Sequence, residues 1–126
     1  MHSENWPREW VQGVREVQAV LHAWRGASAE GWAYSISHSQ LLIRLFRQAE
    51  ASSVAKPPVL YLYLQACRRV SFDSLWRDAD IQIEECFGKR HAEYILRDGE
   101  RLYVHCGVLP SAAESDQPLR FERPCI

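Results

Sequence analysis

Near the start of the chain, apolar residues recur at spacings of three and four, which is the period of an amphipathic helix. The resulting stripe consists of Trp10, Val14, Val17, Leu21 and Trp24. Pro7 suits a first helical turn, where its missing N–H costs nothing, and Gly26 is a natural stop. We therefore predict one N-terminal helix over residues 5–25 that turns its tryptophan stripe toward the core.

Beyond Gly26 the period changes to two, which indicates half-buried strands. Large residues alternate with small ones first at Trp32, Tyr34 and Ile36. The polar segment 37–40 admits two interpretations: it turns the chain into a second strand over 41–47, or one unbroken strand bulges at His38. In both interpretations a sheet begins here, and we expect it to occupy residues 31–107.

The second half of the chain predicts further strands. The run VLYLYLQAC marks one over 59–67, which follows a loop that ends in two prolines. Residues 71–78 are expected to form a connection with one short helical turn anchored by Phe72 and Trp76. From Ala79, apolar and polar residues alternate again, which is the pattern of a strand with one buried and one solvent-exposed face.

The dipeptide Asp98-Gly99 lies between two β-rich runs and favours the tight turn of a hairpin. After it, residues 108–126 form a linker-like tail that could add one edge strand. These patterns predict a single domain over residues 1–126 with an α+β fold. In this fold the N-terminal helix packs on a meander-like antiparallel sheet of five or six strands, with the Asp-Gly hairpin near its C-terminal end.

The strand over 59–67 is unusual because both of its faces are apolar. The face that the helix can cover carries Leu60, Leu62 and Leu64. Tyr61 and Tyr63 point the opposite way, and because each buried ring removes about 150–250 Å² from solvent, an uncovered row of rings is unfavourable. Tyr103 and His105 are expected to join this tyrosine face, because they alternate with apolar residues in the last hairpin strand.

A single predicted helix covers only one face, so the tyrosine face either has another cover or faces water. The tail could fold over it, the sheet could curl into a partial barrel, or another chain could dock there. Tyrosine also tolerates exposure, because its hydroxyl group can stay in water. Docking of another chain is the alternative that implies a function. The protein would then be a non-catalytic module that self-associates as a homodimer or binds another protein.

Charge is unevenly distributed in a chain whose net charge is only −1. Residues 40–72 carry five basic side chains and one acid, whereas residues 73–100 carry eight acids and four bases. Arg44, Arg68 and Arg69 would border the tyrosine face, and this asymmetry could steer a partner or align two copies. The same surface supports an alternative function, the binding of single-stranded nucleic acid or another anion, although the negative total charge argues against it.

Candidate catalytic and metal chemistry is weak in this sequence. It contains no Cys-x-x-Cys or His-x₃-His pair and no glycine-rich nucleotide motif, so no metal or cofactor is predicted. A small enzyme, the third alternative, would use His38 or His105, with Ser37 or Cys106 as a nucleophile. No catalytic residue is assigned on this basis.

The sequence shows neither a leader pattern nor an apolar run of about 20 residues, the length that spans a bilayer. We therefore expect a cytoplasmic protein without membrane association. In that compartment cysteines are reduced thiols, and a buried cysteine behaves as a small hydrophobic residue. The cysteines concerned are Cys67, Cys86, Cys106 and Cys125.

Overall fold

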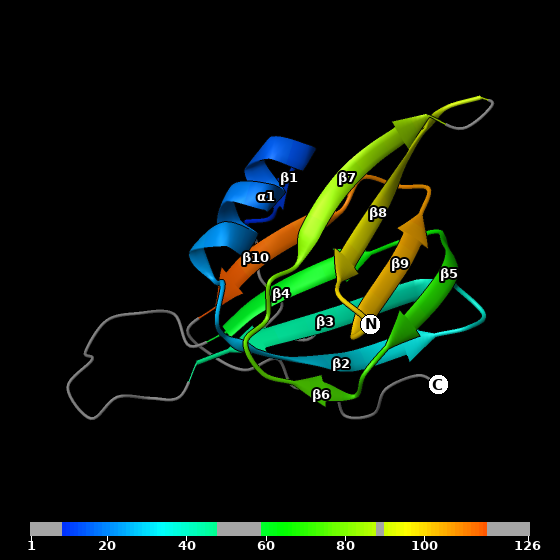
Figure 1. Ribbon diagram of the computed structural model, residues 1–126. Helices are drawn as coiled ribbons and strands as arrows, with labels where there is room; N and C mark the ends of the chain where they lie inside the picture. The colour runs from blue at the N-terminus through cyan, green and yellow to red at the C-terminus, as the bar shows by residue number, and fades with distance from the viewer. Residues whose placement is uncertain (1–8, 48–58, 88–89, 116–126) are drawn as a thin grey trace.

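The computed structural model describes residues 9–47, 59–87 and 90–115, which form two antiparallel sheets and one helix, α1 (Val14–Ala23). The six-stranded sheet consists of β1 (Val11–Gln12), β2 (Ser28–Ser35), β3 (Gln40–Phe46), β4 (Val59–Leu64), β6 (Leu75–Trp76) and β10 (Ser111–Ser115). The four-stranded sheet consists of β5 (Cys67–Phe72), β7 (Gln82–Phe87), β8 (Ala92–Asp98) and β9 (Leu102–Cys106). Their spatial orders are β1-β10-β4-β3-β2-β6 and β5-β9-β8-β7, and the fold is α+β with strands dominating (Figure 1).

The helix is shorter than the range 5–25 that the apolar stripe predicts, because α1 begins only after Gly13. Gly13 has a φ of 120°, and the residues before it pair as β1 with β10. Of the stripe, Val17 and Leu21 of α1 and Trp24, which caps the C-terminus of the helix, contribute to the core. Trp10 is not helical and packs instead against Tyr63, with ring centroids 6.1 Å apart. Residues 5–8 lie outside the described ranges.

The strand predicted over 59–67 is two strands that belong to different sheets. β4 ends at Leu64, and β5 begins at Cys67 in the four-stranded sheet. Between them Ala66 has a φ of 54°, in the left-handed region, which breaks the extended backbone and shifts the two-residue alternation. Cys67 consequently faces the same core as the leucines of β4 rather than the tyrosine face.

One sheet of five or six strands was therefore the wrong architecture, since the described residues form ten strands in two sheets. The four-stranded sheet covers the leucine face of β4 together with α1 (Figure 1). Their shared core contains Leu60, Leu62 and Leu64 with Leu96, Leu102 and Val104 of β8 and β9. Alternation along a strand could not reveal this, because it indicates which residues are buried but not which layer buries them.

Two short segments also differ from expectation. The turn 36–39 separates β2 from β3, so the alternative of one unbroken strand with a bulge at His38 is wrong, and the register instead shifts at Trp32. β6 takes the place of the helical turn expected within 71–78, and it pairs with β2. β6 brings the connection after β5 alongside the six-stranded sheet.

The predicted tail, 108–126, contributes an interior strand rather than a linker or an edge. β10 pairs with β4 on one side and with β1 on the other, so residues outside the predicted range 31–107 complete the six-stranded sheet. Ala112 of β10 lies in the shared core. Residues 116–126, where the edge strand was expected, lie outside the described part of the chain.

β8 and β9 form an antiparallel hairpin at Asp98-Gly99. Gly99 has a φ of 56°, and the Arg101 N–H donates to the Asp98 carbonyl oxygen at 2.9 Å. The buried Asp98 carboxylate accepts hydrogen bonds from Trp76 Nε1 at 2.8 Å, Asp80 N at 2.9 Å and Arg101 Nη2 at 2.6 Å. Because Trp76 belongs to β6, this carboxylate ties the hairpin to the six-stranded sheet.

The two sheets meet along one side and are separated by α1 on the other. At the closed side the Phe72 ring of β5 lies over Gly31 of β2, where a Cβ atom would be 2.2 Å from the ring. On the other side α1 lies between β7 and β10, and the Ile83 N–H donates to Gln18 Oε1 at 2.8 Å (Figure 1). This arrangement leaves each sheet with one outer face.

Candidate functional site

The seven residues expected to form one surface lie on the outer faces of two different sheets. The six-stranded sheet carries Tyr61, Tyr63 and Arg44, whereas β5 and β9 of the four-stranded sheet carry Arg68, Arg69, Tyr103 and His105. The expectation that Tyr103 and His105 extend the tyrosine face is therefore wrong. They project outward from the four-stranded sheet, because Val104 between them points into the core.

Tyr61 lies in a small second core on the outer face of the six-stranded sheet. Its exposed fraction is 0%, and this core comprises Leu42, Val59 and Tyr61 with Trp10, Trp32, Ala33 and Tyr63 packed around them. Tyr63 is half-buried, and burial raises the pKa of its hydroxyl group above 10.0. Tyr61 therefore offers no area to a partner, and Tyr63 offers only part of its surface.

Arg44 is engaged within the six-stranded sheet. Its guanidinium carbon lies 3.9 Å from the centre of the Trp32 ring and 5.5 Å from the centre of the Phe46 ring. It also forms an ion pair with Glu30, its cross-strand neighbour, and both side chains are only 20% exposed. The charge of Arg44 is thus neutralised within the protein and does not add to a basic docking surface.

On the outer face of the four-stranded sheet, a buried carboxylate lies between two basic side chains. Glu93 of β8 is 7% exposed, and its Oε2 accepts a hydrogen bond from Arg68 Nη1 at 3.1 Å. Its Oε1 contacts Nε2 of His105, which makes an ion pair when the imidazole is protonated. We call Glu93, Arg68 and His105 the Glu93 cluster. A buried carboxylate is stable only when such partners bind it, so losing either contact is costly. Glu93 therefore holds the Arg68 and His105 side chains in place.

Further charged and aromatic side chains surround the Glu93 cluster. The Arg97 guanidinium lies 5.5 Å from the centre of the Tyr103 ring, and its Nη2 lies 3.0 Å from Glu84 Oε1. Arg69 is next to His105 across the β5–β9 ladder and is exposed. Among the described residues Arg69 has no ion-pair partner, so its positive charge is uncompensated.

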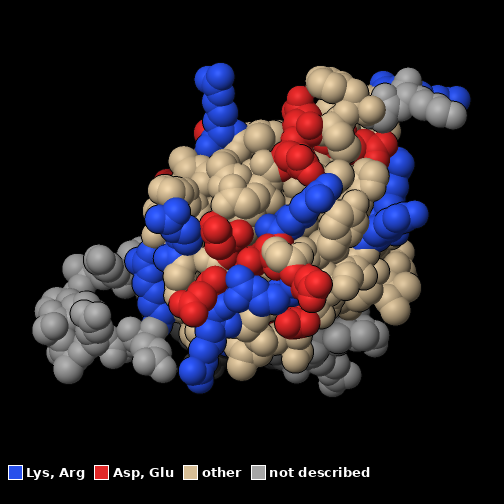
Figure 2. Space-filling model, viewed as in Figure 1, with Lys and Arg blue, Asp and Glu red and all other residues tan. Residues whose placement is uncertain are grey.

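Opposite charges lie at the two sides of the four-stranded sheet. β5 carries Arg68 and Arg69, and β7 carries Glu84 and Glu85. In Figure 2 basic side chains lie over β5 on the right, and acidic side chains lie over β7 near the top. Figure 1 shows no described helix in front of this sheet, so a partner can reach its outer face.

Two buried cysteines face each other across β5 and β9, but they are poor nucleophiles. Burial raises the pKa of Cys67 to about 11 and that of Cys106 to about 12. Because the thiolate is the reactive form, neither thiol is activated at neutral pH. Within the described ranges, no group of three or more His, Cys, Asp and Glu side chains is arranged to hold a metal ion.

His38 has hydroxyl groups beside it but no enclosure. Its Nδ1 lies 3.1 Å from the Oγ atoms of both Ser35 and Ser37, at the turn between β2 and β3. His38 and Ser37 are exposed, and no described acidic side chain bonds the other ring nitrogen. A hydroxyl and an imidazole in open solvent do not by themselves support nucleophilic catalysis.

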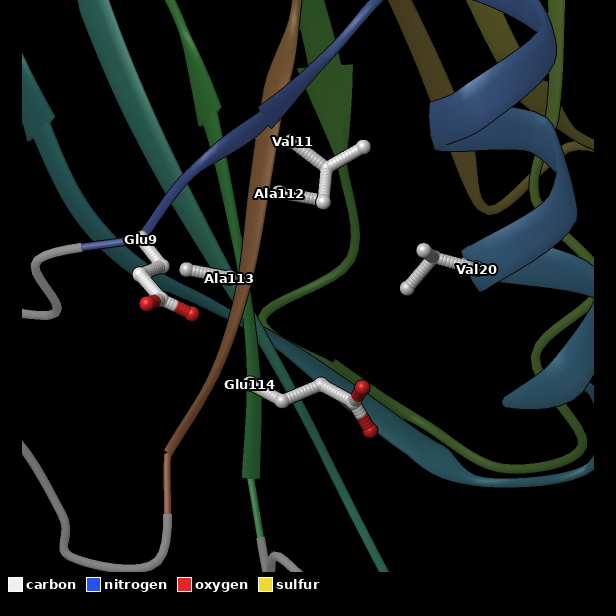
Figure 3. A pocket seen from close by; sticks show the side chains of 6 residues that line it. All are labelled: Glu9, Val11, Val20, Ala112, Ala113 and Glu114. Atoms are coloured by element: carbon white, nitrogen blue, oxygen red, sulfur yellow. The ribbon is translucent and has the colours of Figure 1, made fainter.

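Two small cavities occur among the described residues. One of about 190 Å³ lies between α1 and β10 and is lined by Glu9, Val11, Val20, Ala112, Ala113 and Glu114 (Figure 3). The other, of about 180 Å³, is lined by Gln82, Ile83, Glu84 and Arg97. Small-molecule pockets usually measure about 300–1,000 Å³, so neither cavity is large enough for a typical ligand.

Comparisons with protein-family models, with curated proteins and with solved structures gave no match for this chain. In the part of the chain that the structure describes, no helix is long and apolar enough to cross a membrane. The candidate functional site is therefore chosen on structural grounds. It is the outer face of the four-stranded sheet, where the Glu93 cluster fixes side chains on a surface that solvent can reach.

Proposed function

We propose that this protein is a non-catalytic protein-interaction module that forms a homodimer through the outer face of the four-stranded sheet. The main support for the proposal is the opposite charge of the two sides of this face, with Arg69, which has no ion-pair partner among the described residues, on β5 and Glu84 on β7. A two-fold axis parallel to the strands, between β8 and β9, would place β5 of one copy over β7 of the other. The basic side of each copy would then lie opposite the acidic side of the other, which gives a closed dimer.

The middle of the face supports docking of a second copy. Ile95, Tyr103 and His105 are half-buried there, and tyrosine and arginine are enriched in protein interfaces. The Glu93 cluster holds His105 in one position, which reduces the entropy lost on association. Glu84 can exchange its present partner, because the Glu84 and Arg97 side chains are 57% and 55% exposed and such pairs contribute little.

Light scattering over a range of concentrations tests the homodimer. We expect a mass approaching twice the 14.6 kDa of one chain, and we expect Arg69→Glu to return the protein to a monomer by placing two acids opposite each other. Arg15→Glu, a charge reversal on an exposed residue of α1, is the matched control and should leave the dimer intact.

A charge swap sharpens this test. Combining Arg69→Glu with Glu84→Arg should restore the dimer, because the two sides of the face simply exchange sign. A wild-type protein that stays monomeric at every concentration would refute self-association through this face.

A second candidate function is the binding of single-stranded nucleic acid by the same face. It is favoured by the uncompensated Arg69 and the half-buried Tyr103 on neighbouring strands, since arginines can hold phosphates while a base stacks on an aromatic ring. Fluorescence anisotropy with a labelled oligothymidine should then show affinity that falls as salt rises and that drops in Tyr103→Ala but not in Tyr103→Phe. Absence of salt-dependent binding would eliminate this candidate.

A further inference from the structure

β7 is an edge strand whose outer side is only partly covered. In the order β5-β9-β8-β7 it has a single neighbour, β8. The Ile83 N–H donates to the side chain of Gln18 on α1 at 2.8 Å, so the backbone of Ile83 points away from β8. Figure 1 shows α1 beside the first part of β7, whereas the last part extends beyond the helix.

The alternation of an antiparallel ladder places the next backbone groups on the same side. In such a ladder, the N–H and C=O groups of successive residues point alternately to the two sides of the strand. Because the backbone N–H of Ile83 points away from β8, the backbone N–H and C=O groups of Glu85 and Phe87 also point away from β8. Those of Glu84 and Cys86 point toward β8 and bond to it. The outward groups of Glu85 and Phe87 have no hydrogen-bond partner among the described residues. Such an open edge is a template for another strand.

The side chains around this open edge favour a basic partner. Glu84 and Glu85 are exposed on opposite faces of β7, and Phe87 is 83% exposed. A second copy of β7 would bring like charges together, since an antiparallel pair centred on Glu85 puts two Glu85 side chains directly opposite each other. A strand that carries lysine or arginine at this position meets Glu85 with opposite charge.

We propose that the outer edge of β7 at residues 85–87 binds an extended basic segment of another protein, which adds a fifth strand to the four-stranded sheet. The main-chain groups of Glu85 and Phe87 supply hydrogen bonds, and the carboxylate of Glu85 selects lysine or arginine. Phe87 lies on the same face of β7 as Glu85, so its ring gives the aliphatic stem of a neighbouring lysine of the partner an apolar contact. This site goes beyond the proposed homodimer, because the dimer uses the outer face of the sheet and the basic segment uses its edge.

A labelled peptide of alternating lysine and valine residues tests the proposal, with a glutamate–valine peptide of equal length as the matched control. We expect saturable binding of the lysine peptide and none of the glutamate peptide. Amide hydrogen exchange should slow at Glu85 and Phe87 when the lysine peptide binds. It should not change at Cys86, whose amide already bonds to β8.

Two variants separate an added strand from simple attraction between charges. Glu85→Pro removes an outward N–H without removing a bond to β8, and Glu85→Ala removes the same charge but keeps the N–H. We expect the lysine peptide to bind Glu85→Pro roughly fivefold more weakly than Glu85→Ala, the effect of one lost hydrogen bond. If the proline variant fails to fold, Glu85→Lys serves instead, and it should prefer the glutamate peptide.

Equal affinity of the proline and alanine variants, or unchanged exchange at Glu85 and Phe87, would overturn the proposal. Failure of the lysine peptide to bind a protein that is dimeric would also overturn it and would leave the homodimer standing. Binding of the peptide to a protein that is monomeric would support this site and refute only the homodimer.

Discussion

Cys67 and Cys106 show how surroundings set the role of a side chain. They are cross-strand neighbours in the shared core, and Cys106 Sγ lies 3.6 Å from the carbonyl oxygen of Tyr94. Burial disfavours the charged thiolate, which raises the pKa of Cys67 to about 11 and that of Cys106 to about 12. Both residues therefore act as small apolar side chains that pack between the sheets.

We expect iodoacetamide at about pH 8 to modify the half-buried Cys86 well before Cys67 and Cys106 in the folded protein, because the two core thiols stay protonated. Peptide mass spectrometry measures the three sites separately, and urea-unfolded protein is the control in which all should react. Rapid modification of Cys106 without unfolding would contradict this prediction.

The same pKa shifts predict the direction in which stability depends on pH. Since the folded-state pKa values lie above the ordinary value of 9.0, the folded protein holds these protons more tightly than the unfolded chain. Their contribution to stability is complete below about pH 9 and is lost as the pH rises toward the folded values. Urea unfolding of the wild type and of Cys106→Ala should show the smaller alkaline loss of stability in the variant.

At the scale of the elements, the break between β4 and β5 depends on the backbone of Ala66. Its φ of 54° lies in the left-handed region, where a side chain other than glycine costs roughly 1–2 kcal/mol. The Ala66 side chain is exposed, so packing does not offset this cost. The break is nevertheless maintained, because β4 pairs along its length in one sheet and β5, apart from a bulge at Arg68, pairs with β9 in the other.

Ala66→Val should lower the free energy of unfolding by about 1 kcal/mol, because a β-branched side chain tolerates the left-handed region less well than alanine. Ala66→Gly should cause no such loss, since glycine has no Cβ to clash. Urea unfolding of the two variants measures the difference. Equal destabilisation by valine and glycine would show that backbone strain is not the cause.

At the scale of the whole molecule, a few contacts make two sheets one unit. The shared core joins residues of both sheets with α1, and the Asp98 carboxylate bonds to Trp76 across the layers. At the closed side, Gly31 of β2 allows the Phe72 ring of β5 to approach the backbone directly. Each contact joins residues that are distant in the chain, so loss of one should weaken the entire fold.

Gly31→Ala should lower the free energy of unfolding by about 1–3 kcal/mol, because the new Cβ would lie 2.2 Å from the Phe72 ring. In a Phe72→Ala background the same substitution should cost much less, since the ring is gone. A double-mutant cycle followed by urea unfolding measures this coupling. Strictly additive effects of the two substitutions would contradict the proposed contact.

The candidate site contains a contact that local sequence patterns do not predict. Its charged and aromatic members are visible in the sequence, but Glu93 was not expected to matter, because its contact with His105 depends on the hairpin register. A tight two-residue turn at Asp98-Gly99 would pair Glu93 with Val104, whereas the observed turn of three residues pairs Asp98 with Leu102 and puts Glu93 diagonal to His105. One residue of turn length therefore decides which side chains can meet.

Periodicity was sufficient to indicate antiparallel strands, an α+β composition and core positions such as Leu60, Leu62 and Leu64, because alternation is a property of each strand alone. It could not divide the strands between two sheets, place Trp10 beside Tyr63, or separate Tyr61 from Tyr103. Those outcomes depend on the turn at Ala66 and on pairings between distant segments. Only the energy of the complete packed molecule selects among them, since each segment taken alone is equally compatible with either arrangement.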